Sequence, residues 1–222
     1  MWIAPSRDSE ILNWTDEHWK VLTFAFEHDW DVAVAIFEDR IKYRYLDAIE
    51  VLQKDDTAHY WEHKQRRFGF AMLALDCLLI ETLAQFYSGL KSSDEAREAL
   101  RLNNTEFYVK FLIEKSFILK SAFDKPAALA FYRTIRCGIL HQAETKEDSL
   151  IRFLNDENNS DKLFKLSDDK KSLKIYWSNF HQIVKSEFET YCAHLRRNDG
   201  PDDLRGNFKK KMDFICRSGE PA

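Results

Sequence analysis

The stretch FGFAMLALDCLLIETLAQFYSGL, residues 68–90, decides the fold because it is apolar on nearly every side. A helix with this pattern normally lies at the centre of a bundle, surrounded by other helices. Gly89 is well placed to end it, because glycine readily adopts the left-handed conformation that closes helices. The longest apolar part, GFAMLALDCLLI, contains Asp76 and is too short to span a bilayer, which favours a core helix.

The composition of the whole chain also favours a helical protein. Its 222 residues include only 6 glycines and 4 prolines, so residues that break helices are scarce. This scarcity argues against an all-β sandwich, a glycine-rich nucleotide-binding fold and a disordered tail. Hydrophobic residues make up 45% of the chain and charged residues 32%, an ordinary balance for a protein with a core. We therefore expect a single, mostly α domain over residues 1–222.

Two helices are expected before the central stretch. Residues 1–9 are interpreted as a loose lead-in, and Ser9 or Thr15 caps a first helix that ends near position 28. Apolar residues at spacings of three and four predict a second helix over 31–53. The charged residues 54–67 contain no glycine or proline, so a further helix could begin within them.

Further helices are expected after the central stretch. Residues 91–99 form a polar link in which Ser93 is a good cap for a short turn. A helix is predicted over 107–123. The Asp-Lys-Pro sequence at 124–126 then begins the next helix, which carries residues 127–140, with the aspartate as its cap and the proline in its first turn.

The pattern changes after the fifth predicted helix. Short alternating runs predict a small antiparallel hairpin or three-stranded flap, with strands at 149–154, 162–166 and 172–177 and turns at 155–161 and 167–171. Ser178 or Asn179 starts a helix that ends near position 197. Gly200 and Pro201 then break the chain before a last helix over roughly 203–217, in the segment 200–222.

Charge and cysteine usage restrict the class of function. The formal net charge is −4, so nucleic acid would have to be bound by a local patch rather than by the field of the whole molecule. The four cysteines are far apart and form no CxxC pair, which gives no support to a zinc knuckle or a redox motif. The N-terminal residues do not resemble a signal peptide, so we expect a cytoplasmic protein without membrane contact.

The most informative motif is FYRTIRCGILHQ at residues 131–142, in which Arg136 and His141 are five residues apart. Five residues of ideal helix turn through about 500°, which leaves the two side chains roughly 140° apart. They converge only if the helix bends or ends between them, or if the long arginine reaches around. Gly138 lies at the position where such a bend would be needed.

Arginine and histidine together suit phosphodiester chemistry. Arginine holds nonbridging phosphate oxygens with two hydrogen bonds and stabilises the charge that develops on phosphorus. Histidine can take the proton from a ribose 2′-OH or give one to the leaving 5′-oxygen. One histidine cannot conveniently do both in one step, so a two-fold dimer that joins two copies of the motif would supply the second group. This chemistry requires no metal and no cofactor.

The Arg136-Cys-Gly-Ile-Leu-His141 sequence resembles the signature of the HEPN superfamily, which is an arginine, four to six residues and a histidine at the end of a helix in an all-α bundle. The resemblance covers about residues 30–197, the expected core of the domain. It implies a HEPN-type helical bundle and a metal-independent endoribonuclease that acts on RNA as a homodimer. It further implies a role as a toxin or in defence or stress response, with a regulatory or antitoxin protein as a possible partner.

By matching positions, Arg136 would bind phosphate and His141 would transfer the proton. Arg133, one turn before, could extend the phosphate site, and Cys137 and Gln142 complete the predicted substrate-binding set. The position after the arginine is commonly asparagine in the family, whereas this chain has Cys137. One HEPN toxin branch carries a tyrosine two residues after the histidine, where an antitoxin modifies it. Ala143 stands there in this chain and gives no support to that branch.

Two other interpretations of the motif remain open. The chain could be a non-catalytic HEPN-like module that dimerises or binds a nucleotide or a protein partner. Alternatively, the two residues could be purely structural, with His141 capping a helix end and Arg136 paired with a carboxylate such as Glu81. The neighbouring aromatic residues Phe107, Phe111 and Phe131 follow helical spacing, which favours the core or a dimer interface over base stacking.

The sequence offers a remote metal-binding alternative. The His59-Tyr-Trp-Glu62-His63 sequence matches the H-x-x-E-H spelling of an inverted zinc peptidase, and its histidines share one helical face. No third ligand is evident, so we favour a polar helix without a metal. Asp47 and Glu50 are one turn apart, but nothing else indicates an acid–base pair, and we expect them on the surface.

Two basic clusters lie outside the motif. Lys64, Arg66 and Arg67 could bind an RNA backbone, although such a run is more often a solvated helix face. The run Lys209-Lys210-Lys211 is expected to lie on an exposed helix. Neither cluster is therefore included in the predicted site.

Overall fold

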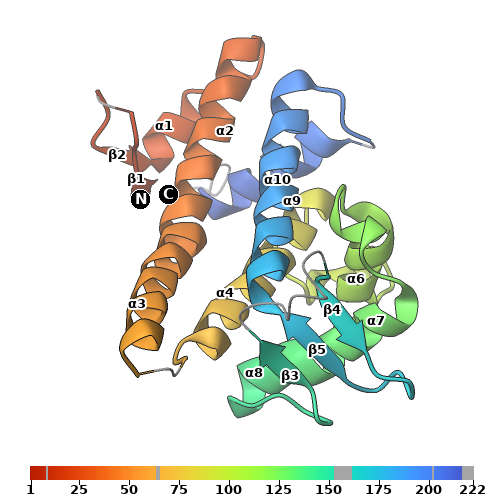
Figure 1. Ribbon diagram of the computed structural model, residues 1–222. Coiled ribbons are helices and arrows are strands. Elements are labelled where there is room, and N and C mark those ends of the chain that lie inside the picture. The colour runs from red at the N-terminus through yellow and green to blue at the C-terminus, as the bar shows by residue number, and fades with distance from the viewer. Residues whose placement is uncertain (9, 64–65, 153–161, 202, 217–222) are drawn as a thin grey trace.

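The computed structural model describes residues 1–8, 10–63, 66–152, 162–201 and 203–216 (Figure 1). The fold is mostly helical and is built around helix α4, Gly69–Ser88. Helices α9, Trp177–Arg197, and α10, Leu204–Ile215, pack against α4, and α2 lies alongside α9 (Figure 1). The mostly α fold class predicted from the sequence is confirmed at this level.

Helix α4 confirms the prediction made from its sequence. Gly89 follows it with a φ angle of 63°, the left-handed conformation that ends a helix. Within the described residues α4 alone is long and apolar enough to cross a membrane, but half of its most apolar window is buried against neighbouring elements. Its apolar side chains, including Leu79 and Leu83, belong to the core of the protein. The central position of α4 in the fold explains why this helix is apolar on nearly every side.

The N-terminal region differs from its prediction. The expected loose lead-in contains strand β1, Trp2–Pro5, which pairs with strand β2, Asn13–Thr15. Thr15 does cap a helix, because its side chain and that of His18 form a reciprocal capping box. That helix, α1, covers only Asp16–Lys20, and the chain then turns before α2. The single helix expected to end near position 28 is therefore wrong.

The helix predicted over 31–53 is confirmed, and it extends further in both directions. It consists of α2, Glu27–Ile41, the π-turn η1, Lys42–Leu46, and α3, Asp47–His63. No new helix begins within the charged residues up to position 63, because α3 continues through them.

The fully buried carboxylate of Asp56 determines how the chain enters α4. It accepts hydrogen bonds from the Arg66 guanidinium at 3.0 Å and from the backbone N–H groups of Arg67 and Phe68 at 2.6 and 3.1 Å. These bonds satisfy donors that precede the first turn of the helix.

The helix predicted over 107–123 is only partly correct. It begins earlier, as α6, Asn104–Lys110, after the short helix α5, Glu95–Ala99, and continues as the π-turn η2, Phe111–Lys115. We call α6 and η2 together the pocket helix. It ends before the short 3₁₀ helix η3, Leu119–Ser121, because the buried Glu187 carboxylate accepts the N–H groups of residues 117, 118 and 119 at 2.6–3.1 Å.

The next helix agrees with its prediction. Asp124 caps it by accepting the Ala127 N–H at 2.8 Å, and Pro126 lies in its first turn. It runs without a break through α7, Lys125–Ala130, the π-turn η4, Phe131–Arg136, and α8, Cys137–Gln142. We call residues 125–142 the motif helix.

Three strands follow the motif helix, as predicted, but their pairing is not wholly antiparallel. Strands β3, Leu150–Arg152, β4, Phe164–Leu166, and β5, Leu173–Tyr176, form a sheet in the order β3-β5-β4 (Figure 1). Strand β5 is antiparallel to β4 and parallel to β3. The turn at 167–171 is present, and the turn predicted at 155–161 lies outside the described residues.

The last two helices agree with the predicted order. Helix α9 begins at Trp177, one residue before its predicted start, and the chain breaks at Gly200 and Pro201 before α10. Arg205 of α10 joins the two ends of the fold, because its guanidinium contacts Glu27 of α2 at 2.6 Å and the Leu195 carbonyl of α9 at 2.7 Å.

Candidate functional site

The motif helix does not bend between Arg136 and His141. Its irregular part, the π-turn η4, ends at Arg136, and a regular α-helix then runs through Gly138 to Gln142. The predicted bend at Gly138 is therefore wrong. Arg136 points inward to α4 and His141 outward to solvent, as five residues of regular helix require.

Gly138 has a different role, which is to let the returning chain pass close to the helix. A Cβ atom at this position would collide with the carbonyl oxygen of Glu144 and would lie 3.3 Å from the Thr145 Cα atom. The same return path brings the Lys146 N–H to the carbonyl of Thr134 in η4 at 3.0 Å. The glycine is thus explained by backbone packing at the helix end.

Arg136 is held in place from two sides. Its Nη2 atom donates to Oε2 of Glu81 on α4 at 2.5 Å, and its guanidinium lies 5.4 Å from the centre of the Tyr132 ring. The Arg136 side chain is only 15% exposed. Its buried Nε atom makes no hydrogen bond to any described residue, so one donor of the guanidinium stays unused. The structural alternative, in which Arg136 pairs with Glu81, is therefore the arrangement observed.

The contact with Glu81 keeps the Arg136 guanidinium charged. Burial by itself favours the neutral form of Arg136, but the hydrogen bond and the negative charge of Glu81 outweigh it, so the pKa of Arg136 is raised. Burial also raises the pKa of the neighbouring Tyr132 hydroxyl. The guanidinium is therefore a permanent cation beside a neutral phenol at any physiological pH.

A chain of polar side chains leads from Glu81 across α4 to α10. The Ser93 hydroxyl donates to Glu81 at 2.7 Å and accepts from the Gln85 amide at 3.0 Å. The Lys211 ammonium donates to the amide oxygen of Gln85, Oε1, at 2.8 Å. We call these side chains the polar chain. The prediction that Ser93 caps a helix is wrong, since its hydroxyl belongs to this network.

Lys211 also departs from the expected exposed position. It is only 6% exposed and donates to the Lys91 carbonyl as well as to Gln85. Burial, with a smaller effect from the charge of Arg40, lowers the pKa of Lys211 to about 8. Lys209, in contrast, forms an ordinary ion pair with Asp213 one turn further along α10.

The outer face of the motif helix carries the other predicted site residues. Arg133, His141 and Gln142 are exposed, and Cys137 is half-buried. Arg133 and His141 form no hydrogen bond or ion pair with any residue that the structure describes. The alternative in which His141 caps a helix end is therefore wrong. The structure brings together Arg136, Glu81 and Tyr132, and it leaves His141 on the opposite face.

The sequence reasoning missed a buried polar cluster in the core. The Asp76 carboxylate, fully buried on α4, accepts from His181 Nδ1 at 2.8 Å and from the Trp177 indole at 3.0 Å. Burial raises the pKa of Asp76, although the hydrogen bond and charge of His181 act in the opposite direction. The signal was an aspartate inside an otherwise apolar helix, which needs a buried partner.

The competing sites from the sequence are not assembled. His59 and His63 do stack on α3, with ring centres 4.4 Å apart, but no third potential metal ligand joins them among the described residues. Asp47 pairs with Arg7 at 2.6 Å and Glu50 with Lys54 at 2.8 Å, so these acids face separate cations.

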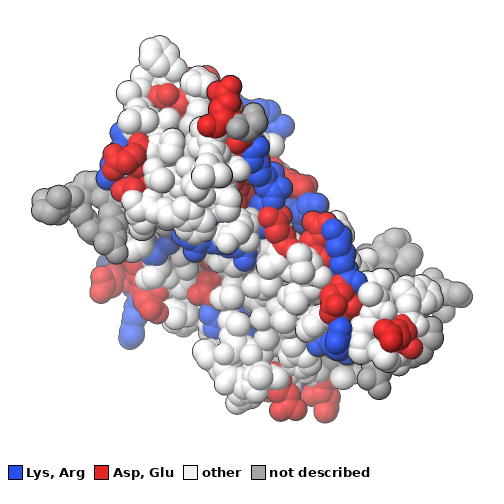
Figure 2. All heavy atoms as spheres, turned by 90° about the vertical axis from the view of Figure 1, so that its left-hand side faces the viewer, with Lys and Arg blue, Asp and Glu red and all other residues white. Residues whose placement is uncertain are grey.

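The first basic cluster is largely neutralised. Arg66 pairs with Asp56 at 3.0 Å and Arg67 with Asp55 at 2.7 Å, while Lys64 lies outside the described residues. Figure 2 shows acidic and basic side chains mixed over the face formed by the N-terminal strands and α1–α3. This mixture does not favour the binding of an RNA backbone on that face.

The aromatic residues near the motif mostly serve the core. Phe131 is fully buried and packs on Phe180 with ring centres 5.1 Å apart, and Tyr108 packs on Tyr132 at 5.3 Å. The contact between Tyr108 and Tyr132 joins the pocket helix directly to the motif helix. These rings are therefore part of what fixes the position of Arg136.

Comparison with known proteins adds no relative to this description. No family model, no curated protein and no solved structure matches the chain.

Proposed function

We propose that the protein is a HEPN-type, metal-independent endoribonuclease that acts in the cytoplasm as a homodimer, in defence or in a toxin or stress response. Arg136 binds the phosphate and His141 transfers protons, with Arg133, Cys137 and Gln142 along the bound RNA. The observation that carries the proposal is the position of His141. It is exposed, has no hydrogen-bond partner among the described residues, and lies about one and a half turns beyond a fixed guanidinium.

The reaction assigns one step to each group. The 2′-oxygen of a ribose attacks the adjacent phosphorus as a histidine takes its proton, and the bond from phosphorus to the 5′-oxygen breaks. A second histidine gives a proton to that oxygen, and the products are a 2′,3′-cyclic phosphate and a 5′-hydroxyl. The Arg136 guanidinium stabilises the charge that develops on the phosphate oxygens.

A dimer is needed because one copy separates the two groups on opposite faces of its helix. An isologous two-fold contact along the motif helices would place His141 of the partner subunit near His141 of the first copy. The exposed Arg133 is then on the same side as both histidines and can contact the RNA phosphates. The inward Arg136 reaches a phosphate only by exchanging its contact with Glu81 for one with the substrate.

A second candidate function is a non-catalytic module that dimerises or binds a nucleotide or a regulatory protein. The 2.5 Å contact between Arg136 and Glu81 favours it, because a carboxylate already occupies the position that a phosphate would need. In this case the exposed face of Arg133 and His141 serves recognition rather than chemistry.

Cleavage of structured RNA in the presence of EDTA tests the proposal. Wild-type protein is expected to produce 2′,3′-cyclic phosphate ends. His141→Ala should reduce the rate by at least about 100-fold, since general acid–base catalysis contributes this much or more. His28→Ala is the matched control, because His28 is an exposed histidine on α2, remote from the motif.

Three outcomes would contradict the proposal. Cleavage that stops in EDTA and is lost in His63→Ala would point to the metal-binding alternative on α3. A protein that is dimeric but inert toward a broad set of RNAs would favour the binding module. A monomer at all concentrations, measured by light scattering, would exclude the two-copy site.

A further inference from the structure

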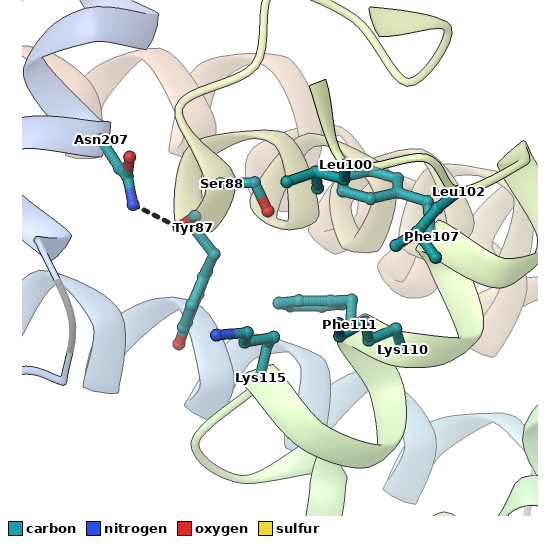
Figure 3. A pocket seen from close by; sticks show the side chains of 9 residues that line it. All are labelled: Tyr87, Ser88, Leu100, Leu102, Phe107, Lys110, Phe111, Lys115 and Asn207. Carbon is teal, nitrogen blue, oxygen red and sulfur yellow. Dashed lines mark hydrogen bonds between the residues drawn. The ribbon is translucent and has the colours of Figure 1, made fainter. Parts of the chain in front are cut away.

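A cavity lies at the C-terminal end of α4, on the side of the molecule formed by the pocket helix (Figure 3). Its volume is about 340 Å³, within the range of pockets that hold small organic molecules. Residues from α4, the pocket helix, the α5–α6 region and α10 line it, so four parts of the chain form one site. None of the residues of the motif helix lines it, and it is separate from the proposed catalytic site.

The walls of the cavity are aromatic and fixed. Phe107 and Phe111 of the pocket helix are 3% and 2% exposed, and Tyr87 of α4 is 8% exposed. The Tyr87 hydroxyl donates to the buried Glu187 carboxylate at 2.5 Å, and the Asn207 amide donates to the Tyr87 carbonyl at 2.9 Å. Tyr87 is therefore held both at its hydroxyl and at its backbone. In Figure 3 the rings of Tyr87, Phe107 and Phe111 surround the open space.

Among the described residues, the charged side chains that line the cavity are two lysines, Lys110 and Lys115. Lys110 makes no hydrogen bond or ion pair with any described residue. The two lysines are five residues apart, a spacing that regular helix would turn to different faces. The π-turn η2 brings them together, because its hydrogen bonds close over five residues, as in the 3.0 Å bond from Ser116 N–H to the Phe111 carbonyl.

A polar group completes the cavity between the rings and the lysines. The Ser88 hydroxyl lines the cavity, points into the open space in Figure 3, and makes no hydrogen bond to any described residue. Aromatic walls, two ammonium groups and one unused hydroxyl fit a flat ring that carries a negative charge. Such a ligand would bury its ring against Phe107 and Phe111 and bring its negative charge to the Lys110 ammonium.

We propose that this cavity binds a small aromatic carboxylate, with the ring against Phe107 and Phe111 and the carboxylate at Lys110, beside Lys115. The site is independent of the proposed nuclease activity, and either can be absent without the other. A nucleoside monophosphate also combines a planar ring with an anionic group. The experiment therefore compares an aromatic carboxylate with a nucleotide.

Titration calorimetry with 2-naphthoate as the probe tests the proposal on the full chain. Wild-type protein is expected to bind one 2-naphthoate, and the neutral 2-naphthamide at least about 10-fold more weakly. The double variant Lys110→Gln/Lys115→Gln should weaken 2-naphthoate by a similar factor, because both charges are removed. Lys120→Gln is the matched control, since Lys120 is an exposed lysine near the pocket helix that does not line the cavity.

The melting temperature of each variant is measured alongside, so that unfolding is not mistaken for lost binding. No saturable binding of 2-naphthoate by folded wild-type protein would overturn the proposal. Equal binding of the acid and the amide, or unchanged binding by the folded double variant, would also overturn it. Tighter binding of AMP than of 2-naphthoate, with the same dependence on Lys110 and Lys115, would assign the site to a nucleotide and overturn the carboxylate.

Discussion

The motif helix and the pocket helix each contain a π-turn and a pair of basic residues five positions apart, yet they arrange these pairs differently. In the pocket helix the π-turn lies between Lys110 and Lys115, and both residues line one cavity. In the motif helix the π-turn ends at Arg136, so the path to His141 is regular helix and the two residues face apart.

The comparison teaches that spacing in the sequence does not determine whether two side chains converge on a helix. The position of the wide turn relative to the pair decides it, since a π-turn changes the rotation accumulated between the two residues. A five-residue motif therefore describes a site within one chain only when the turn falls inside it. Where the turn falls outside, as for Arg136 and His141, the two side chains of one copy face apart.

The largest expected effect comes from breaking the charge pair that fixes the motif helix. Arg136→Ala leaves the half-buried Glu81 without its cation and should reduce the free energy of unfolding by about 3 kcal/mol. Lys110→Ala in the pocket helix removes a cation that has no partner among the described residues and should change it little. Urea denaturation of both variants measures the difference.

A compensating double variant sharpens this first test. Glu81→Leu/Arg136→Met replaces the pair by apolar side chains of similar size and should recover most of the lost stability. Equal losses for Arg136→Ala and Lys110→Ala would contradict the view that Arg136 is fixed by its pair.

The next effect tests the role assigned to Gly138. Gly138→Ala should lower the free energy of unfolding by about 2 kcal/mol, because the added methyl group meets the backbone of Glu144. Gly69→Ala is the control within a helix, since its methyl group would lie at an ordinary 3.6 Å from Ile151. Thermal denaturation compares them, and a neutral Gly138→Ala would mean that the returning chain moves away easily.

A smaller effect on stability is expected from pH, which acts on Lys211 at one end of the polar chain. The pKa of Lys211 is about 8 in the folded state, below the usual lysine value of 10.5, because the ammonium is buried. Between these values the unfolded chain binds the proton and the folded chain does not, so this group makes stability rise with pH. The gain should be about 1–2 kcal/mol, given by the difference between wild type and Lys211→Met in urea denaturation at pH 8 and pH 10.

Other groups titrate in the same range, and the comparison with Lys211→Met removes their contribution. A curve for Lys211→Met that runs parallel to the wild-type curve between pH 8 and pH 10 would contradict a lowered pKa.

The smallest effect concerns how the two helices end. The motif helix ends on Ala143 in the left-handed conformation, with a φ angle of 55°, whereas the pocket helix ends on an extended Ser116. Ala143→Gly should therefore stabilise the protein by about 0.5–1 kcal/mol, because glycine adopts this conformation without strain. Ser116→Gly should bring no such gain. A melting temperature that rises in both variants, or in neither, would contradict this explanation.

Local signals in the sequence predicted much of the fold. The cap at Asp124, the proline after it, and Gly89 fixed helix ends correctly, because each acts through the backbone next to it. The apolar pattern of α4 and the alternation of the three strands were equally reliable. In each of these cases, interactions among a few residues close together in the sequence determine the local structure.

The sequence failed where distant residues decide the structure. Glu187 ends the pocket helix from some 70 positions away, and no pattern near residue 117 announces it. The parallel pairing of β3 and β5 likewise joins separate parts of the chain, since Leu150 lies opposite Lys174. Of the candidate site, the motif identified Arg136, His141 and the possible contact with Glu81. No local pattern in the sequence marks the π-turns that orient the side chains.

The pairing of β3 with β5 has a consequence for the order in which the protein is completed during synthesis. Strand β3 directly follows the motif helix, and within the described residues its strand partner is β5, which is made after it and leads into α9. Because a nascent chain emerges from its N-terminus onward, β3 stays without this strand partner until β5 has left the ribosome. The sheet beside the motif helix is thus completed later than the contact between Arg136 and Glu81.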